Sequence, residues 1–342
     1  MKKTFKISTI LIISFLSIIT AVIGESVFTY LKNEQIKKDY SSSDAGISYD
    51  DYYNISDSLI TIYDKDTYKI FENACLGNSN ANLLSYGCYY AKDNIICKST
   101  SNTELIIDGK TLIINETPSS YINIINNNVY YRDDKNRFLK KYNIDTSETE
   151  TVIDKPVGQA VVSTKGVSYI DYQTLCLNFL SFEDGTSKEI SPLKISAFSI
   201  IGNIYLSLCE NKELGFLEQN GDFRKIESDV DRFYYNGQIA IQKNNNIYLI
   251  DKSEKAFAEK RNVDGLLLGL HDNKMYFSHD NSIICCDIEE PDISDNTLYK
   301  CNTNEIIKSI YITDNAVEIQ CYNNTDSETY KLFSYSINKM NE

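Results

Sequence analysis

A short hydrophobic motif recurs seven times along the chain. In each copy an Asn or Gly leads into an apolar anchor residue, and an aromatic or apolar residue follows within two positions. The anchors are Cys88, Val129, Val167, Ile204, Ile239, Met275 and Val317. They are separated by 41, 38, 37, 35, 36 and 42 residues. A period of about 40 residues built from short strands is typical of a β-propeller.

The copy around Val129 illustrates the pattern within one period. Residues 121–125, 129–133, 138–143 and 151–153 are rich in aromatic and β-branched side chains, and Asn and Asp residues separate them. Such segments predict four short strands joined by turns. Elsewhere, Asp184-Gly185 and Asn220-Gly221 fall where a third and a fourth strand need a tight reversal, which Gly permits by tolerating positive φ.

These observations predict an all-β fold, a β-propeller of about seven four-stranded blades, with six or eight blades as alternatives. A β-sandwich gives no reason for near-equal periods, and a parallel β-helix normally repeats over fewer residues. The last copy has three clear strands, at 309–312, 316–319 and 331–335. Residues 59–63 and 68–71 form a half-blade, which we expect to complete the last blade because closure removes exposed strand edges.

The N-terminus carries a second signal. Lys2, Lys3 and Lys6 precede an uncharged run of 18 residues, 7–24. A basic flank before an apolar run is typical of a signal peptide or a signal anchor. The helical pattern continues through 26–38, which favours an uncleaved anchor, with secretion after cleavage as the alternative. We therefore expect a signal anchor or signal peptide at 1–30, a linker at 31–55 and the propeller at 56–342, outside the cell membrane.

The charge distribution restricts the partners. Residues 1–24 hold three Lys and no acid, so the rest of the chain holds 31 of the 34 basic residues and all 48 acidic ones, a net charge of −17. This charge opposes nucleic acids and anionic membrane surfaces as ligands. We expect no nucleic acid partner, and membrane contact through the N-terminal helix only.

The nine cysteines are an odd number, so at least one is free or pairs with another chain. Cys88 and Cys97 are equally far from a turn at Lys92-Asp93, which makes them a possible disulfide. Cys301 could reach Cys285 or Cys286 across the next hairpin; alternatively, several cysteines are buried as small hydrophobic residues. No Cys-x-x-Cys pair occurs, so a zinc or thioredoxin-like site has no support.

Candidate catalytic residues are few. His271 and His279 flank a predicted strand without a third His, so we interpret them as turn residues and expect no metal. No nucleophile-elbow, dinucleotide-binding or P-loop motif is present, so we expect no cofactor. Three acidic pairs could serve glycoside hydrolysis or bind calcium, although 48 acids produce such pairs by chance. They are Asp64/Asp66, Asp229/Asp231 and Glu289/Glu290.

The aromatic residues support a family resemblance. The chain has 26 Tyr and no Trp, and most Tyr fall at strand positions, where blade packing explains them. The segments 130–133, 90–93 and 276–280 all begin with Tyr and end with Asp. They resemble bacterial domain-of-unknown-function propellers similar to the low-density-lipoprotein receptor-related β-propeller, whose strand carries Tyr-Trp-Thr-Asp. The resemblance implies an extracytoplasmic binding propeller of six or seven blades, without catalytic residues.

The favoured function is therefore a membrane-anchored, non-enzymatic propeller outside the cell that binds a protein, a peptide or a cell-surface glycan. The alternative is a propeller-type glycosidase or lyase with carboxylates in the central channel. A third hypothesis is a structural spacer or sensory ectodomain. Convergence of acids from several blades within about 5–10 Å would favour the enzyme, because glycosidases use such separations. A filled channel would favour binding.

Overall fold

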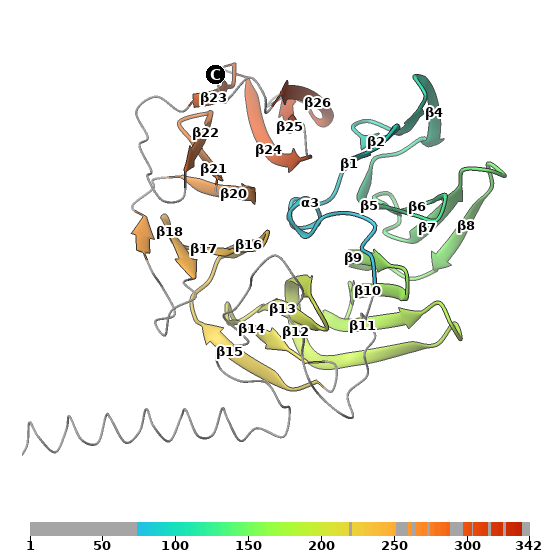
Figure 1. Ribbon diagram of the computed structural model, residues 1–342, viewed down its shortest axis with the longest axis horizontal. Coiled ribbons are helices and arrows are strands. Elements are labelled where there is room, and N and C mark those ends of the chain that lie inside the picture. The colour runs from blue at the N-terminus through green and yellow to red at the C-terminus, as the bar shows by residue number, and fades with distance from the viewer. Residues whose placement is uncertain are drawn as a thin grey trace, which may run out of the picture. The chain divides into compact units, whose positions relative to one another are not determined.

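The computed structural model describes residues 74–218, 221–250, 259–261, 265–271, 274–287, 297–302, 304–313, 316–323 and 326–336 (Figure 1). The predicted signal anchor at 1–30, the linker at 31–55 and the half-blade at 59–63 and 68–71 lie outside these residues. Within the described ranges, no helix is long and apolar enough to cross a bilayer.

The described chain is all-β apart from one short helix, α3 (Asn80–Leu84), as the sequence predicts. The first two sheets contain β1 (Tyr89–Lys92), β2 (Ile95–Ser99), β3 (Thr103–Ile107) and β4 (Lys110–Asn115), then β5 (Ser119–Ile125), β6 (Asn128–Asp133), β7 (Leu139–Asn143) and β8 (Thr149–Ile153). The third contains β9 (Val157–Ser163), β10 (Gly166–Asp171), β11 (Cys176–Ser181), β12 (Ser187–Ile201), β13 (Ile204–Cys209), β14 (Leu214–Leu217) and β15 (Phe223–Glu227). The last three contain β16 (Arg232–Tyr235), β17 (Ile239–Lys243), β18 (Asn246–Ile250) and β19 (Glu259–Arg261), then β20 (Leu266–His271), β21 (Lys274–His279), β22 (Ser282–Asp287) and β23 (Thr297–Lys300), and finally β24 (Glu305–Ile312), β25 (Ala316–Asn323) and β26 (Asp326–Ser336).

Each sheet is an antiparallel meander, in which strands adjacent in sequence are hydrogen-bonded neighbours. We divide the meanders into units 1 to 7, which are β1–β4, β5–β8, β9–β12, β12–β15, β16–β19, β20–β23 and β24–β26. Six of the seven anchors lie buried on the second strand of a unit, as the period predicts. The seventh, Cys88, instead precedes the first strand of unit 1. The glycine turns at Gly185 (φ +70) and Gly221 (φ +94) join third to fourth strands, as expected.

Strand β12 belongs to two units at once. Residues 187–194 pair with β11, and residues 195–201 pair with β13. Pro192 falls within the register shift between the pairs Leu177↔Ser191 and Cys176↔Lys194, where a missing N–H removes no ladder hydrogen bond. Units 3 and 4 therefore share one seven-stranded sheet, which the repeat period alone does not predict.

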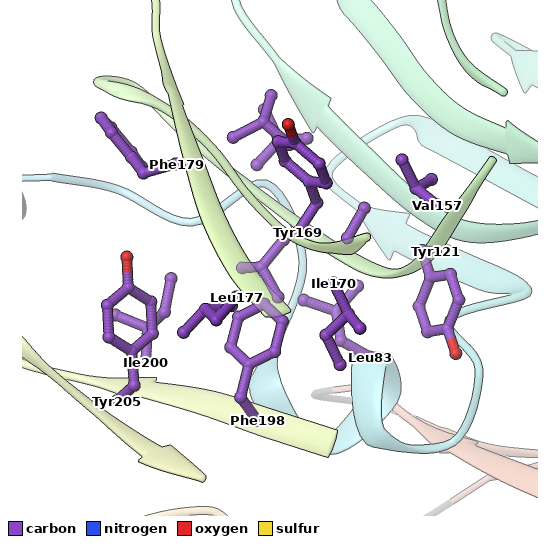
Figure 2. Close-up of a cluster of buried hydrophobic side chains, with 14 of the residues drawn as sticks. Leu83, Tyr121, Val157, Tyr169, Ile170, Leu177, Phe179, Phe198, Ile200 and Tyr205 are labelled. Atoms are coloured by element: carbon purple, nitrogen blue, oxygen red, sulfur yellow. The ribbon is translucent and has the colours of Figure 1, made fainter. Parts of the chain in front are cut away.

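Buried tyrosines fill much of the core between the sheets. Figure 2 shows Tyr169 and Tyr205 in the cluster that also contains Phe198, whose ring meets Tyr205 edge-on with centroids 5.7 Å apart. Both hydroxyl groups have partners: Tyr205 Oη lies 3.0 Å from the buried Ser168 Oγ, and Tyr169 Oη lies 2.9 Å from Oγ of the exposed Ser187 at the edge of the core. A buried hydroxyl without a partner would be unfavourable. This confirms that these tyrosines have a packing role.

Residues 75–87, which we call the hub segment, include α3 and bond to the inner strands of the units. The Gly77 N–H donates to the carbonyl of Val162 in unit 3, at 2.8 Å. The Asn78 side-chain amide donates to two carbonyls in different units, Tyr89 O of unit 1 at 2.9 Å and Ile122 O of unit 2 at 2.8 Å. One buried amide thus joins units 1 and 2, because its two N–H groups diverge.

Helix α3 continues the same arrangement toward later units. The Asn80 side chain donates to the carbonyl of Ile200 in unit 4 at 2.8 Å and accepts from the N–H of the same residue at 3.2 Å. The side-chain oxygen of Asn82, Oδ1, accepts from the N–H of Ile312 in unit 7, at 2.8 Å. The polar face of this short helix is therefore buried against strands, not solvated.

Ser85, the C-cap of α3, reaches the remaining two units. Its hydroxyl lies 3.2 Å from the hydroxyl of Tyr234 in unit 5 and 3.4 Å from the carbonyl of Leu268 in unit 6. The hub segment thus makes hydrogen bonds with all seven units. Figure 1 shows α3 among the inner strands to which these bonds lead.

Glutamine side chains also connect neighbouring sheets directly. Gln159 on β9 donates to the carbonyl of Phe198 on β12 at 2.7 Å and accepts from the N–H of Phe198 at 2.9 Å. Gln242 on β17 repeats this, donating to Gly265 O at 2.9 Å and accepting from Leu267 N at 3.0 Å. These amides satisfy backbone groups that no strand ladder reaches.

Units 7 and 1 are in contact. The Gln320 amide of β25 donates to the carbonyl of Ser99 at the end of β2, at 3.1 Å. The rings of Tyr89 and Tyr311 stack with centroids 6.1 Å apart. The Tyr89 hydroxyl also lies 3.3 Å from Oε1 of Glu318. The last unit in sequence therefore packs on the first.

Candidate functional site

The candidate site lies where the hub segment leaves α3 and meets the beginnings of inner strands. We call it the Tyr86 face and define it by Tyr86, Ser120, Arg132, Asp134 and Tyr172. Successive antiparallel strands reverse direction, so the start of a first strand and the end of a second strand meet at one end of a sheet. The register confirms this, since the start of β5 pairs with the end of β6.

The backbone beneath Tyr86 is held in an unusual conformation. Tyr86 has φ +70, the adjacent Gly87 has φ +56, and Tyr121 has φ +54. Two hydrogen bonds of 2.7 Å join the two segments, from Tyr121 N to Tyr86 O and from Ile122 N to Gly87 O. A Cβ on Gly87 would lie 2.9 Å from the Cα of Tyr121, so only glycine fits there. Positive φ in a tyrosine costs about 1–2 kcal/mol, and such strain is concentrated at functional sites.

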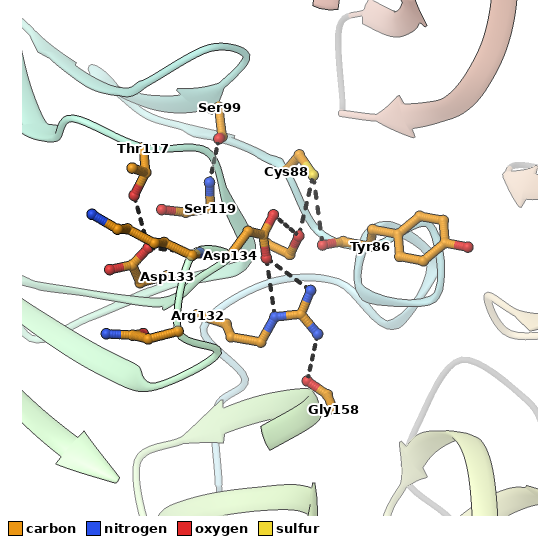
Figure 3. A network of polar contacts seen from close by, with 12 residues as sticks. Tyr86, Cys88, Ser99, Thr117, Ser119, Arg132, Asp133, Asp134 and Gly158 are labelled. Atoms are coloured by element: carbon orange, nitrogen blue, oxygen red, sulfur yellow. Dashed lines mark hydrogen bonds and ion pairs between the residues drawn. The ribbon is translucent and has the colours of Figure 1, made fainter. Parts of the chain in front are cut away.

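Arg132 organises the charged part of this face (Figure 3). Its Nε and Nη2 atoms donate to Oδ1 of Asp134 at 3.1 and 2.8 Å, and Nη1 donates to the carbonyl of Gly158 at 3.1 Å. The guanidinium also lies over the ring of Tyr121, 4.8 Å from its centroid. The second oxygen of Asp134 accepts from the Ser120 hydroxyl at 2.8 Å. The Nη1 bond joins unit 2 to unit 3, and the two bonds to Asp134 hold the guanidinium in the position from which it reaches Gly158.

Asp133 forms a parallel network one residue away. Its carboxylate accepts from Thr117 Oγ1 and from Lys140 Nζ, both at 2.7 Å, and from the N–H of Lys135 at 3.1 Å. Burial disfavours the charged form, but these hydrogen bonds outweigh it and hold the pKa of Asp133 below its usual range. Asp171 on the same face has a lowered pKa for the same reason, with Lys155 as its partner at 2.6 Å.

Two tyrosines project from this face into solvent. Tyr86 is 48 % exposed, and Lys308 Nζ lies 5.8 Å from its ring centroid. Tyr172 is 46 % exposed, and the Arg137 guanidinium stacks over its ring at 4.0 Å. Both rings thus combine exposed aromatic area with an adjacent cation. Sequence reasoning gave these two tyrosines no special role, because nothing in their local pattern distinguishes them from core tyrosines.

The predicted cysteine pair is not assembled as expected. The turn between β1 and β2 lies at Asp93-Asn94, one residue later than predicted, so Cys97 pairs with Tyr90. The backbone carbonyl of Cys88 instead accepts a hydrogen bond from the N–H of Ser99, at 2.9 Å. Both thiols are free and buried in the structure. The one-residue error in the turn moves the register by two residues, so this hairpin does not place Cys88 opposite Cys97.

The remaining candidates are dispersed. His271 ends β20 and His279 ends β21, so the two lie at opposite ends of one hairpin. Asp231 accepts from Lys212 Nζ at 2.7 Å and from Asn244 N at 2.6 Å, a structural role. The other two acidic pairs lie outside the described residues, and among those described no group of three or more His, Cys, Asp or Glu could hold a metal.

Comparison with known proteins identifies similar folds but no family. No protein-family model matches the sequence, and no curated protein matches it. The chain is similar to the AfRom2 CNH domain at 8 % identity, with a TM-score of 0.50 over 78 % of this chain and 95 % of that one.

Two further solved structures are similar at lower TM-scores. The computationally designed Ika8 protein has 14 % identity and a TM-score of 0.49 over 72 % of this chain and 82 % of that one. A chain of a nidogen/laminin complex has 9 % identity and a TM-score of 0.40 over 57 % of this chain and 89 % of that one. The CNH domain and the nidogen/laminin chain are propeller-like or all-β domains, and at these identities the likeness concerns the fold alone.

Proposed function

We propose that the chain is a closed seven-bladed propeller that binds a protein or peptide partner through the Tyr86 face. The hydrogen bonds from the hub segment to all seven units support closure, as does the contact between units 7 and 1. The sequence-based prediction that residues 59–63 and 68–71 complete the last blade is kept as part of this proposal, since three strands are described for unit 7. The segments 130–133 and 90–93 keep the proposed resemblance to Tyr-Trp-Thr-Asp propellers.

The exposed ring of Tyr86, on a strained and strongly bonded backbone, is the single observation that carries the binding proposal. A rigid aromatic side chain offers a large contact area at low conformational entropy, so such residues dominate binding energies. The network of Arg132 and Asp134 fixes the surface beneath, which lowers the cost of ordering on binding. The net charge of −17 on residues 25–342 favours a cationic partner.

The enzyme alternative has weaker support. A glycosidase needs one carboxyl with a raised pKa as general acid and a second carboxylate close by. On the Tyr86 face, Asp133 and Asp171 are paired with lysines and their pKa values are lowered. Burial raises the pKa of Glu318, but this residue lies between units 7 and 1 and is only 6 % exposed. In the proposed closed propeller, the hub segment would occupy the centre, where the carboxylates of a channel would have to converge.

We further propose that residues 1–30 anchor the propeller on the outer side of the cell membrane. The support is the basic flank and the uncharged run of the sequence. Alkaline extraction of membranes from cells that express the full chain tests this proposal. Retention of the intact chain in the pellet is the expected result, and release of a shortened chain into the medium would replace the anchor by a cleaved signal peptide.

Binding through the Tyr86 face can be tested with the full chain as immobilised bait in an extract of source-cell surface proteins. We compare the wild-type chain with Tyr86→Ala and with Ile113→Ala, which removes an equally exposed apolar side chain from the outer strand β4. Thermal unfolding of each variant controls for folding. A partner that binds through Tyr86 should lose at least about 2 kcal/mol, roughly a thirty-fold change in Kd, with Tyr86→Ala and little with Ile113→Ala.

Other results would overturn the proposal. A partner lost with Ile113→Ala but retained with Tyr86→Ala would move the binding surface to the outer edge of unit 1. Binding to a glycan array that depends on Tyr86 would change the ligand class. Release of reducing sugar from a cell-wall preparation would establish the enzyme.

A further inference from the structure

Two cysteines that are distant in sequence lie side by side in the core of the last units. The Sγ atoms of Cys301 and Cys321 are 3.8 Å apart, and the residues are 20 positions apart in the chain. Cys301 follows β23, and its N–H donates to Asn281 O in the turn between β21 and β22, at 2.8 Å. It therefore belongs to unit 6. Cys321 lies on β25, the middle strand of unit 7, opposite Ile307.

The surroundings hold this pair in place. Tyr299 packs against the hydrophobic cluster that contains both cysteines, and its ring centroid lies 5.2 Å from that of Phe333 and 5.7 Å from that of Tyr335. Its hydroxyl donates to Oε2 of Glu305 at 3.1 Å. The same carboxylate oxygen accepts from the backbone and side-chain N–H groups of Asn302. The chain around Cys301 is thus fixed by hydrogen bonds, and its thiol faces another thiol within a hydrophobic cluster that has the Glu305 carboxylate nearby.

We propose that Cys301 and Cys321 form a disulfide that covalently joins unit 6 to unit 7. The two sulfurs are already in van der Waals contact at 3.8 Å, and a bond requires them to approach to about 2.05 Å. The bond would cross between two sheets, so it would restrain the separation of the last unit from its neighbour. This inference does not depend on what the Tyr86 face binds.

The chemistry requires a disulfide-type oxidant, either oxidised glutathione or an oxidoreductase disulfide. One thiolate attacks the oxidant to form a mixed disulfide and release one thiol of the oxidant. The other cysteine then attacks this bond, forming the Cys301–Cys321 bond and releasing the second thiol. The two cysteines lose two protons and two electrons, and the oxidant is reduced to two thiols.

The order of the two attacks follows from accessibility. Cys301 is 8 % exposed and Cys321 is 0 % exposed, so Cys301 takes the mixed disulfide. Burial also raises the pKa of both thiols, which slows the reaction in the folded chain. Oxidation of the folded chain through Cys301 is therefore expected to be slow, and refolding in the presence of the oxidant is expected to form the bond faster.

Peptide mapping of the wild-type chain provides a direct test. The full chain is refolded with oxidised glutathione, alkylated, digested with trypsin without reduction and analysed by mass spectrometry. Cleavage after Lys300, Lys308 and Lys331 places each cysteine in its own peptide, 301–308 and 309–331. We expect a species in which these two peptides are joined, lighter than their sum by two hydrogens, that disappears after reduction.

The same digest distinguishes the other pairings. Cys285 and Cys286 share peptide 275–300, and Cys97 lies alone in 93–98. A link between 275–300 and 301–308, or both target peptides fully alkylated under oxidising conditions, would overturn the proposal.

A second test uses thermal unfolding with and without reductant. Reduction should lower the Tm of the wild-type chain by about 5–10 °C, given the size of the loop and of the domain. The double variant Cys301→Ala with Cys321→Ala should show no such shift. Cys209→Ala, which removes a buried thiol from unit 4, should respond to reductant like the wild-type chain. An equal response in the double variant would refute the pairing.

Discussion

Replacing Gln159 by leucine tests whether side-chain amides hold neighbouring units together. Gln159 is 5 % exposed, and its amide makes both hydrogen bonds of the Phe198 backbone across the boundary between units 3 and 4. Leucine keeps most of the side-chain volume but leaves the N–H and the carbonyl of Phe198 without partners. Each buried group left unpaired costs about 1–3 kcal/mol, and the added apolar burial of leucine offsets a part.

We therefore expect Gln159→Leu to lower the free energy of unfolding by about 3 kcal/mol. In a domain of this size that corresponds to a decrease in Tm of about 6–12 °C. The chain has no Trp and 26 Tyr, so tyrosine emission reports unfolding without interference. The matched control is Gln173→Leu, an exposed glutamine in the turn after β10, whose Tm should change by less than about 2 °C.

Hydrogen exchange separates the proposed cause from a general loss of stability. Under conditions where the folded state is fully populated, the Phe198 amide should exchange faster in Gln159→Leu than in the wild-type chain. The amides of unit 6, where Gln242 forms its own bridge, should change less. The reasoning is refuted if the Tm of Gln159→Leu matches that of Gln173→Leu, or if Phe198 retains its protection.

Two further substitutions test the core. Burial raises the pKa of Glu318 above its value in the unfolded chain, although hydrogen bonds from Tyr89 and Ser334 act in the opposite direction. Ionisation of Glu318 therefore destabilises the folded state as the pH rises. Glu318→Gln should have a higher Tm than the wild-type chain at pH 8. The difference should disappear below about pH 4.5, the pKa of a glutamate side chain in the unfolded chain. A difference in Tm that grows toward acid pH would contradict this expectation. Gly166→Ala should unfold at lower denaturant concentration, because its Cβ would lie 2.1 Å from the carbonyl oxygen of Leu180. The control Gly185→Ala meets no atom within 4 Å and strains only a turn, so an equal loss in both would show that space at Gly166 is not limiting.

The positions of the strands could be predicted closely from the sequence. Alternating side chains and turn residues act over a few positions, so 129–133 and 138–143 appear as β6 and β7 within one residue of their predicted bounds. The predicted position of the turn after β1 was wrong by one residue. Lys92, Asp93 and Asn94 all suit a turn, and only the packing on the two faces of the sheet selects among them.

The candidate site was less predictable than the strands. Tyr86 and Tyr172 are two of 26 tyrosines, and their exposure depends on which end of a sheet each loop occupies. The unusual φ of Tyr86 depends on its bonds to Tyr121, 35 residues away. No local pattern carries that information.

The sequence alone therefore determined the class of fold, the repeat and the positions of most strands, because these depend on side-chain alternation within each hairpin. The tertiary structure decided how the repeats are connected. Asn82 bonds to Ile312, 230 residues away, and Cys301 meets Cys321 although neither belongs to the pair that local symmetry favoured. Such contacts form when distant backbone groups and thiols are buried together, and burial is a property of the assembled sheets.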